Sequence, residues 1–338
     1  MNTYNKRALI TGITGQIGGY LAELLIEKGY EVYGITRKTF DINATKNKNI
    51  VKGVKILSGD LEDFDSIERI IRKVQPHEIY NLAAQSSTII SFELPEYTMK
   101  INGLIIARIC ETVKKINKPI KIYQAGSAEF YGYTQKEIIN EETLFSPKNP
   151  YGIAKLMAFN IIQHYRDRYD MFCCNGIVFN SESPRRGENF VTRKIVSNVA
   201  EITRGKREKI ELGNLNSRRD WIHAKDTAKA IWMMMQAPIP SDYIVASGEA
   251  HSIKEFVELA FKEVEIEVEW KGEGLDEIGY DKKTRKIIVT INPKYYRSED
   301  RDITGDSSKL RLETDWKQEY SFEDIVKEMT KFELENYD

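Results

Sequence analysis

The sequence predicts an α/β fold in which a doubly wound parallel sheet is combined with a smaller C-terminal α/β domain that binds substrate. Short apolar runs alternate with amphipathic stretches through the first half, and a glycine-rich turn directly follows the first run. The length of 338 residues also exceeds what a single core usually fills. Right-handed crossovers between successive strands then give a parallel sheet with helices on both faces.

The apolar runs of the first half have the length and β-branched content of buried strands. We expect strands at residues 7–11, 31–36, 54–57, 78–82, 120–124 and 172–178. The stretches between them have helical spacing, and we expect helices at residues 16–28, 64–74, 95–116 and 150–169.

The second half is less regular. We expect one more strand at residues 242–246, a small hairpin or lid at residues 270–291, and helices at residues 190–204, 223–236, 252–263 and 321–336. No internal repeat or low-complexity tract interrupts the pattern.

The charge balance excludes partners that need a strong global field. Fifty Lys and Arg against 51 Asp and Glu give a net charge of −1, so neither nucleic acid nor an anionic membrane is an expected partner. No apolar stretch approaches the ~20 residues that span a bilayer, and the first residues resemble no signal or transit peptide. The three cysteines lack metal-ligand spacing. We expect a cytoplasmic enzyme that acts on a small molecule and holds no metal.

The glycine-rich turn predicts a dinucleotide site. Residues 11–18 (TGITGQIG) connect the first strand to the first helix. Glycine there permits a tight turn and close approach of the backbone to a pyrophosphate, and the helix N-terminus offers unpaired N–H groups. The sheet is therefore expected to be Rossmann-like, with the cofactor held by Gly12, Ile13, Thr14, Gly15, Gln16, Ile17 and Gly18.

The end of the second strand favours NADP over NAD. NAD-binding proteins usually carry an acid there to hold the ribose 2′-hydroxyl, whereas this chain has Arg37 and Lys38, which suit a 2′-phosphate. The alternative is a solvated basic turn. The residues after two further strands also fit a cofactor site. Asp60 and Leu61 follow the third strand, and Leu82, Ala83, Ala84, Gln85 and Ser86 follow the fourth. The alternative is that each is an ordinary strand end with no ligand.

Four residues form a candidate catalytic group. Tyr151 and Lys155 are four residues apart at the start of a predicted helix, so they share one face, and a nearby ammonium favours the phenolate. Such a tyrosine can exchange a proton with a substrate hydroxyl. Ser127 and Glu129 follow the fifth strand, where ligands bind in doubly wound sheets. A carboxylate such as Glu129 suits removal of a proton beside a carbonyl; the alternative is a solvated or ion-paired acid.

Together these motifs resemble the extended short-chain dehydrogenase/reductase family, and within it the GDP-mannose 4,6-dehydratases. The resemblance covers nearly the whole chain. The motifs that carry it are GITGQIGGYLAELL, EIYNLAAQS, SFELPEYT, QAGSAEFYG, NPYGIAK, NGIVFNSESPRRGENFVTRKI, GNLNSRRDWIHAKD and NPKYYR.

The resemblance implies a hydro-lyase that uses NADP and forms a homodimer or homotetramer. It assigns catalysis to Ser127, Glu129, Tyr151 and Lys155 and adds Tyr97, Lys155 and Arg186 to the cofactor site. It also implies that a GDP-sugar is bound by Asn180, Lys194, Arg219, Arg297 and Glu299.

The chain departs from the family pattern at four places. Ile17 stands where an aspartate is usual, Ser181 replaces a histidine, and Ala128 replaces a hydroxyl beside the candidate base Glu129. Residues 295–306 (YYRSEDRDITGD) are one residue shorter than the usual segment and lack its proline.

The favoured reaction converts GDP-mannose to GDP-4-keto-6-deoxymannose by internal hydride transfer and loss of water, a step of deoxysugar biosynthesis. Alternatives are a dehydratase of a related GDP-sugar such as a GDP-heptose, a sugar-nucleotide reductase or epimerase, and, remotely, a non-catalytic NADP-binding protein. We expect residues 1–178 to form the NADP-binding domain, with parts of 213–246 returning to it, and residues 179–338 to form the interleaved GDP-sugar-binding domain.

Overall fold

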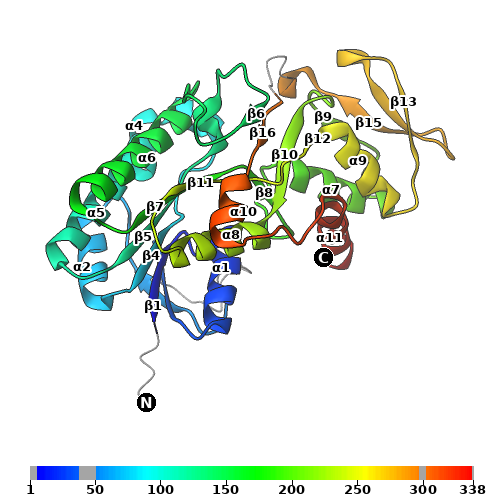
Figure 1. Cartoon of the computed structure of the whole chain (residues 1–338). Helices are drawn as coiled ribbons and strands as arrows, with labels where there is room; N and C mark the ends of the chain where they lie inside the picture. The colour runs from blue at the N-terminus through cyan, green and yellow to red at the C-terminus, as the bar shows by residue number, and fades with distance from the viewer. Residues whose placement is uncertain (1–5, 38–50, 297–301, 337–338) are drawn as a thin grey trace. The chain divides into compact units, whose positions relative to one another are not determined.

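The computed structural model describes residues 6–37, 51–296 and 302–336. The chain forms two compact units and passes between them several times (Figure 1). The first unit comprises Met1–Phe179, Ala224–Val245 and Asp306–Lys317. The second unit comprises Asn180–His223, Ala246–Gly305 and Gln318–Asp338.

The first unit is built on a sheet of seven parallel strands, in the order β11-β7-β5-β4-β1-β2-β3. The strands are β1 (Arg7–Thr11), β2 (Glu31–Thr36), β3 (Lys55–Ser58), β4 (Glu78–Asn81), β5 (Lys121–Ala125), β7 (Cys173–Val178) and β11 (Asp242–Val245). The predicted doubly wound sheet is confirmed, and the strand order reverses between β1 and β4. Open α/β sheets bind ligands at such a point, outside the carboxyl ends of the strands.

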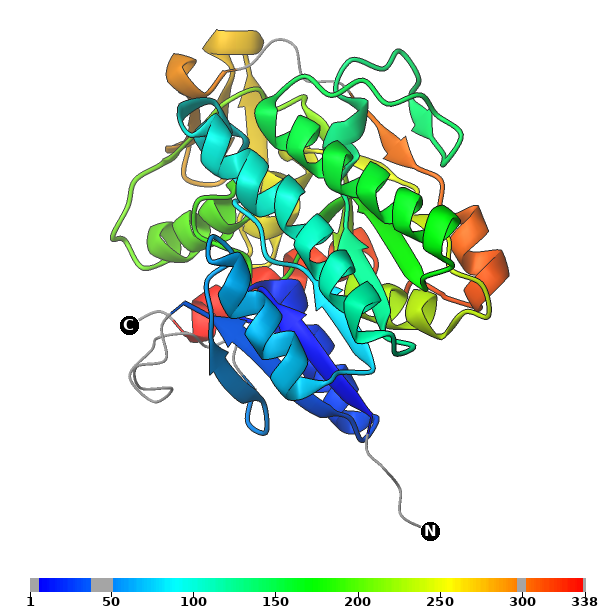
Figure 2. The same ribbon diagram turned by 90° about the vertical axis from the view of Figure 1, so that its left-hand side faces the viewer.

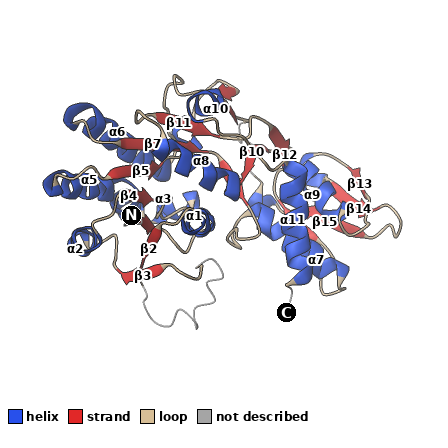
Figure 3. Ribbon diagram, turned by 60° about the horizontal axis from the view of Figure 1, so that its bottom comes forward, coloured by secondary structure: helices blue, strands red, loops and turns tan. Residues whose placement is uncertain are grey.

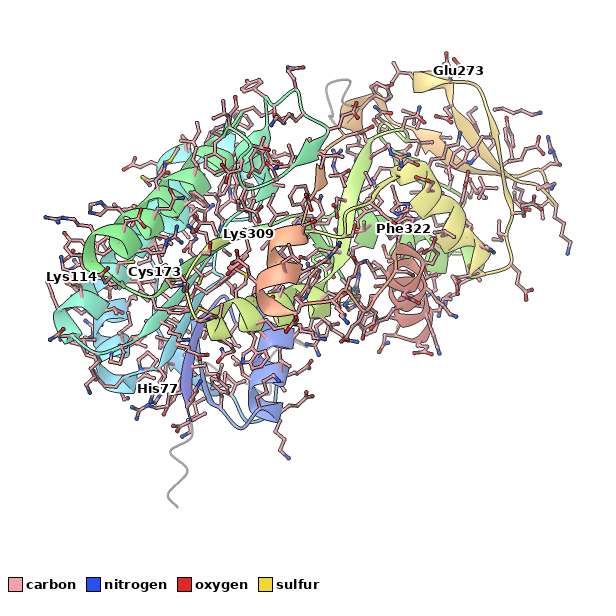
Figure 4. The ribbon with its side chains drawn as sticks, viewed as in Figure 1. His77, Lys114, Cys173, Glu273, Lys309 and Phe322 are labelled. Carbon is pink, nitrogen blue, oxygen red and sulfur yellow. The ribbon has the colours of Figure 1, made fainter. Side chains whose placement is uncertain are left out.

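Helices cover both faces of this sheet (Figure 3). One face carries α1 (Gln16–Glu27), α8 (Ala224–Gln236) and α10 (Ser308–Thr314), and the other carries α2 (Phe64–Val74), α5 (Ile105–Ile116) and α6 (Pro150–Tyr169). Under α2, α5 and α6 the core contains Ile79, Ile109 and Cys173, which lies on β7 (Figure 4). No helix in the described ranges is both long and apolar enough to cross a membrane.

Helix α10 was not expected from the sequence. Its residue Lys309 donates a hydrogen bond of 2.7 Å to the Ser241 hydroxyl and one of 3.0 Å to the Asp242 carbonyl, beside β11 (Figure 4). On the same helix, Glu313 accepts a hydrogen bond from the Tyr243 hydroxyl at 2.8 Å. These polar contacts attach a segment from near the C-terminus to the first unit. The segment has no apolar periodicity from which the helix or its position could be predicted.

The helix predicted at residues 95–116 is not a continuous α-helix. It consists of α4 (Pro95–Met99), a π-helical turn (Lys100–Leu104) and α5, and it runs beside α6 (Figure 2). A Cβ on Gly103 would lie 3.0 Å from the Ala154 carbonyl oxygen, so the glycine allows the turn to approach α6 closely. Additional short elements are α3 (Thr88–Glu93), a 3-10 helix (Ala128–Tyr131) and β6 (Ile138–Ile139).

The second unit combines two small sheets with three main helices. One sheet has the order β12-β10-β8 and the other β13-β14-β15-β9. The strands are β8 (Asn180–Glu182), β9 (Ile210–Leu212), β10 (Arg218–His223), β12 (Ala250–Ser252), β13 (Val268–Lys271), β14 (Ile278–Asp281) and β15 (Ile287–Ile291). A short strand, β16 (Thr304–Gly305), belongs to neither sheet. The helices are α7 (Val191–Thr203), α9 (Ile253–Lys262) and α11 (Phe322–Glu335), with 3-10 turns at Gly274–Asp276 and Pro293–Tyr295. The predicted hairpin is present as β14 and β15, with β13 as a third antiparallel strand.

An aromatic stack forms the centre of the second unit. Phe322 on α11 stacks on Trp221 of β10, with ring centroids 5.5 Å apart and planes inclined by 6° (Figure 4). Its ring also stacks on His251, at 3.9 Å. The neighbouring Asp220 is fully buried and accepts hydrogen bonds from Ser247, Gly248 and Gly305. Two residues of the RDW motif therefore hold this unit together.

A row of buried polar side chains crosses the large sheet. Thr11, Asn81, Gln124, Asn175 and Asp242 occupy matching register positions on β1, β4, β5, β7 and β11. Because in-register residues of parallel strands point to the same face, the five side chains lie side by side. All five are less than 10% exposed.

Helix α6 is attached to one end of this row. Arg166 makes a bidentate ion pair with Asp242, with N–O distances of 2.8 and 2.7 Å, and Gln163 donates to the same carboxylate at 2.8 Å. Asn175 donates to Asp242 at 2.8 Å and to the Phe159 carbonyl at 3.3 Å. Burial acts to raise the pKa of Asp242, but the hydrogen bonds and the charge of Arg166 outweigh it and lower the pKa.

We expect Asp242→Asn to destabilise the protein by about 3 kcal/mol, because it leaves the half-buried guanidinium without a counter-charge. Since the pKa of Asp242 is lowered by folding, this stabilisation is present above the ordinary aspartate pKa of about 4 and is lost as the pH falls through the folded value. Urea unfolding at pH 7 and at acidic pH measures both effects.

The control is Glu68→Gln, which breaks the ion pairs of Glu68 with Arg72 on α2 and with Arg108 on α5, all of them partly exposed, and should cost less than about 1 kcal/mol. Equal losses in the two variants at pH 7 would contradict the assigned role of Asp242.

Candidate active site

The glycine-rich turn joins β1 to α1 at the point where the strand order reverses. Gly12 has φ +72°, and a Cβ there would lie 2.7 Å from the Ala83 nitrogen. A Cβ on Gly18 would lie 2.3 Å from the Gly12 carbonyl oxygen. Both positions therefore require glycine, and the turn packs directly against the segment that follows β4.

The beginning of α1 can hold a phosphate. Gly15 is its N-cap, no side chain caps the helix, and its first turn contains no acidic residue. The first N–H groups and the positive end of the helix dipole are therefore not opposed by an acidic residue of the helix's own first turn. Arg37 is exposed directly after β2, and the Asp60 carboxylate accepts from the Glu62 nitrogen at 3.0 Å after β3. The residues present thus fit a dinucleotide, as the sequence predicts.

The segment 82–86 is held from two sides. The Thr11 hydroxyl accepts from the nitrogens of Leu82 and Ala83, both at 3.1 Å. The buried amide of Asn102, in the π-helical turn, bonds both the nitrogen and the carbonyl oxygen of Gln85, each at 2.8 Å. The π-helical turn therefore fixes the segment 82–86. Tyr97, which is also predicted to contact the cofactor, is half-buried on α4.

Hydrogen bonds connect the glycine-rich turn to Lys155. Thr11 donates to Asn81 at 2.6 Å, Asn81 donates to Gln124 at 2.7 Å, and Gln124 donates to the Ala125 carbonyl at 2.9 Å. The Lys155 ammonium donates to that same carbonyl oxygen, also at 2.9 Å. The side chain of Lys155 is buried, which lowers its pKa to about 8.

Tyr151 and Lys155 lie on one face of α6, as their spacing predicts. The Lys155 nitrogen is 5.9 Å from the centroid of the Tyr151 ring. Helix α6 begins here because Asn149 is its N-cap, accepting from the Gly152 nitrogen at 2.8 Å, and Pro150 follows at the first helical position. The tyrosine, half-buried in the first turn, is thus placed by local sequence signals.

Ser127 and Glu129 lie in the 3-10 turn that follows β5. The Ser127 hydroxyl caps this turn by accepting from the Glu129 nitrogen at 3.2 Å. The Glu129 carboxylate accepts a hydrogen bond from the Asn149 amide at 2.7 Å. The first unit therefore brings all four predicted catalytic residues to the carboxyl end of β5 and the start of α6.

Several residues of this site were not singled out in the sequence. Asn149 falls within the NPYGIAK motif, and Asn81 and Gln124 fall within predicted strands and the motifs EIYNLAAQS and QAGSAEFYG, but no role is predicted for any of the three. A helix-start signal, Asn before Pro, marks Asn149, but no local pattern shows that its amide reaches Glu129, twenty residues earlier.

The predicted residues of the second unit form separate groups. Arg186 pairs with the buried Glu182 at 3.3 Å and lies over the Phe190 ring at 3.5 Å. The Lys194 ammonium donates to the Glu211 carbonyl at 2.7 Å and lies 4.2 Å from the Tyr295 ring centroid, and burial lowers its pKa.

Two other predicted substrate residues lie near each other on adjacent strands. The Asn180 amide donates to the Asp220 carbonyl at 3.2 Å, and Arg219 donates to the Arg218 carbonyl at 2.6 Å. Arg297 and Glu299 lie outside the described residues. Within the described ranges, no group of three acidic, His or Cys side chains is arranged to hold a metal ion.

Comparison with solved structures supports the fold. The dTDP-glucose 4,6-dehydratase of Bacillus anthracis in complex with NAD is 22% identical, with a TM-score of 0.79, and covers 98% of this chain and 97% of its own. The RMD protein of Pseudomonas aeruginosa, complexed with NADPH, is 19% identical, with a TM-score of 0.77; the match covers 98% of this chain and 100% of that chain. At these identities the likeness concerns the fold alone.

Sequence comparison is more specific. The GDP-mannose 4,6 dehydratase of Drosophila melanogaster is 47% identical over 342 residues, covering 98% of this chain and 87% of that protein. The family model described as GDP-mannose 4,6 dehydratase matches residues 9–329. The chain therefore belongs to the GDP-mannose 4,6-dehydratase family, as its motifs indicate.

Proposed function

We propose that the protein is an NADP-dependent hydro-lyase that converts GDP-mannose to GDP-4-keto-6-deoxymannose. The observation that carries this proposal is the meeting of a carboxylate, Glu129, with the Tyr151–Lys155 pair at the carboxyl end of β5. Alcohol oxidation by such a tyrosine and lysine needs no carboxylate, whereas elimination beside a carbonyl also requires a base. The 47% identity to a GDP-mannose 4,6 dehydratase supports the substrate.

Proton transfer in the first step is assigned to Tyr151. The charged Lys155 favours the phenolate, which takes the proton of the C4 hydroxyl, and Ser127 hydrogen-bonds the same oxygen. When bound, NADP supplies the hydride acceptor for C4 and later the hydride donor for C6. We assign its binding in the first unit to the turn at Gly12–Gly18, to Arg37 and Asp60, and to the segment 82–86.

The elimination is assigned to Glu129. A ketone at C4 makes the C5 proton acidic, and the Glu129 carboxylate takes it. The C5–C6 double bond then forms as the C6–O bond breaks, and the proton on Glu129 leaves with the hydroxyl as water. Ala128 offers no hydroxyl for this transfer, so Glu129 acts on both the proton and the leaving group. Once C6 has received the hydride, the proton that Tyr151 took from the C4 hydroxyl returns to C5, which completes the 4-keto-6-deoxy product.

The GDP-sugar is assigned to cations of the second unit. Lys194 and Arg219 suit the diphosphate, and Asn180 suits a sugar or phosphate oxygen. Further cations, including Arg193 and Arg218, are already ion-paired with Glu333 and Glu255.

We also propose a cytoplasmic homodimer or homotetramer. Ala107 on α5 and Leu156 and Met157 on α6 line a depression on the outer face of this helix pair. Such an apolar helical surface suits association with a second copy. Light scattering of the purified protein gives the mass of the assembly.

The substrate prediction is tested with a panel of GDP-, UDP- and dTDP-sugars followed by mass spectrometry. We expect GDP-mannose to lose one water, a decrease of about 18 Da, without net formation or consumption of NADPH. Stoichiometric consumption of NADPH would instead indicate a reductase, and reaction of only a UDP- or dTDP-sugar would refute the nucleotide assignment.

Variants separate the two proton transfers. We expect Tyr151→Phe to slow oxidation at C4 by about 10²- to 10⁴-fold, and Glu129→Gln to slow water loss by a similar factor, because each removes a general acid–base group. Stopped-flow absorbance at 340 nm follows oxidation, and quenched-flow mass spectrometry follows water loss. The control is Glu137→Gln, which changes an exposed carboxyl in the loop after the 3-10 turn and should alter neither rate. Normal turnover of Tyr151→Phe or of Glu129→Gln would refute the role assigned to that residue.

The buried lysine predicts a pH dependence. Because the pKa of Lys155 is lowered to about 8, the ammonium is present below that pH and is lost above it. We expect kcat/KM, which reports the free enzyme, to fall above about pH 8. A profile that stays flat from pH 7 to 9.5 would contradict the role of the Lys155 charge.

The glycine-rich turn predicts the effect of one added methyl group on cofactor affinity. In Gly18→Ala the new Cβ collides with the Gly12 carbonyl, so we expect NADPH affinity to fall at least about tenfold, or 1.4 kcal/mol. Gly29→Ala is the matched control: its φ of +79° makes it strained, but nothing lies within 4 Å of the Cβ. NADPH fluorescence titration should show wild-type affinity for the control.

A further inference from the structure

The side chain of Asn149 connects two parts of the candidate active site. Its oxygen accepts from the Gly152 nitrogen at 2.8 Å and so caps α6, and its nitrogen donates to Oε2 of Glu129 at 2.7 Å. The residue is 5% exposed. Both the oxygen and the nitrogen of the amide therefore have a partner. If the amide were flipped, its NH2 group would face the Gly152 N–H and its oxygen would face the Glu129 carboxylate, so only the observed orientation satisfies both partners.

The backbone at this junction is tightly packed. A Cβ on Gly152 would lie 2.6 Å from the Glu129 carbonyl oxygen. The 3-10 turn that carries Glu129 and the first turn of α6, which carries Tyr151, are therefore in direct contact. Pro150 fixes the backbone between the cap and Tyr151. Displacement of the Asn149 amide consequently displaces the carboxylate relative to the tyrosine.

From this geometry we propose that Asn149 is a positioning residue that holds the Glu129 carboxylate for the elimination step. The inference rests on the proposed dehydratase function. Within the described chain, Asn149 is the one side chain that hydrogen-bonds this carboxylate. The bond occupies Oε2, which leaves Oε1 to take the C5 proton and release it with the departing hydroxyl as water. The amide donates to Oε2 both before and after Oε1 is protonated.

No smaller capping residue performs both tasks. Serine at this position caps a helix by accepting from the same backbone N–H, but its hydroxyl is attached directly to Cβ and ends short of the reach of the asparagine nitrogen. Aspartate also caps, but it places a second carboxylate against Glu129. Asn149→Ser therefore removes the contact with Glu129 and keeps the helix start, and Asn149→Asp replaces that contact by repulsion.

The test separates oxidation from elimination in single turnover with GDP-mannose. We expect Asn149→Ser to leave C4 oxidation, seen at 340 nm, within about threefold of wild type. Water loss and exchange of the C5 proton with deuterated solvent should slow about 10- to 100-fold, as for a catalytic group misplaced by about 1 Å. Absorbance at 340 nm should therefore accumulate in the variant, and Asn149→Asp should be slower still in water loss.

Two controls make the result specific. Asp63→Ser exchanges the N-cap of α2 and should not alter the ratio of the two rates. In a double-mutant cycle, Asn149→Ser should slow water loss no further when Glu129 is already Gln, because Asn149 acts through that carboxylate. Additive losses, equal slowing of both steps, or an unchanged ratio of rates in Asn149→Ser would overturn the proposal. Failure of the proposed function is distinct, because the wild-type protein would then not dehydrate GDP-mannose.

Discussion

The row of buried polar side chains across the large sheet is the constraint on which the candidate site depends. Thr11, Asn81, Gln124, Asn175 and Asp242 stand in register on five parallel strands. A slip of any of these strands by one residue would move its polar side chain to the opposite face and leave a buried partner without a hydrogen bond. The row therefore fixes the register of five strands, and Thr11, Asn81 and Gln124 stand at or next to the carboxyl ends of β1, β4 and β5, where the site lies.

The same row holds α6 at two points. At one end Asp242 binds Arg166 and Gln163. On the middle strand, β5, the Ala125 carbonyl accepts from Gln124 and also from Lys155. Because α6 is bonded to the sheet at two points, the position of Tyr151 on it is restricted. A fixed position suits a group that must exchange a proton with a substrate hydroxyl. Burial of Lys155 destabilises its charged form, so the position that orients this lysine also lowers its pKa.

Much of this arrangement was readable along the chain. Alternating apolar runs predicted the strands of the large sheet, the glycine-rich turn predicted the loop before α1, and the spacing of Tyr151 and Lys155 predicted a shared helix face. Each of these signals is local, because it depends on residues within one or two turns or one strand. The π-helical turn at residues 100–104 was missed since it depends on a tertiary contact, the Asn102 amide with the Gln85 backbone.

The sequence by itself determined the family, the order of strands and helices in the first half, and the identity of the candidate catalytic residues. Tertiary structure alone decided that residues 306–317 join the first unit, that Arg166 pairs with Asp242 76 residues away, and that Asn149 reaches Glu129. Periodicity and spacing report the face on which a side chain lies. Which polar atom satisfies a buried partner depends on segments that meet only when the chain is folded.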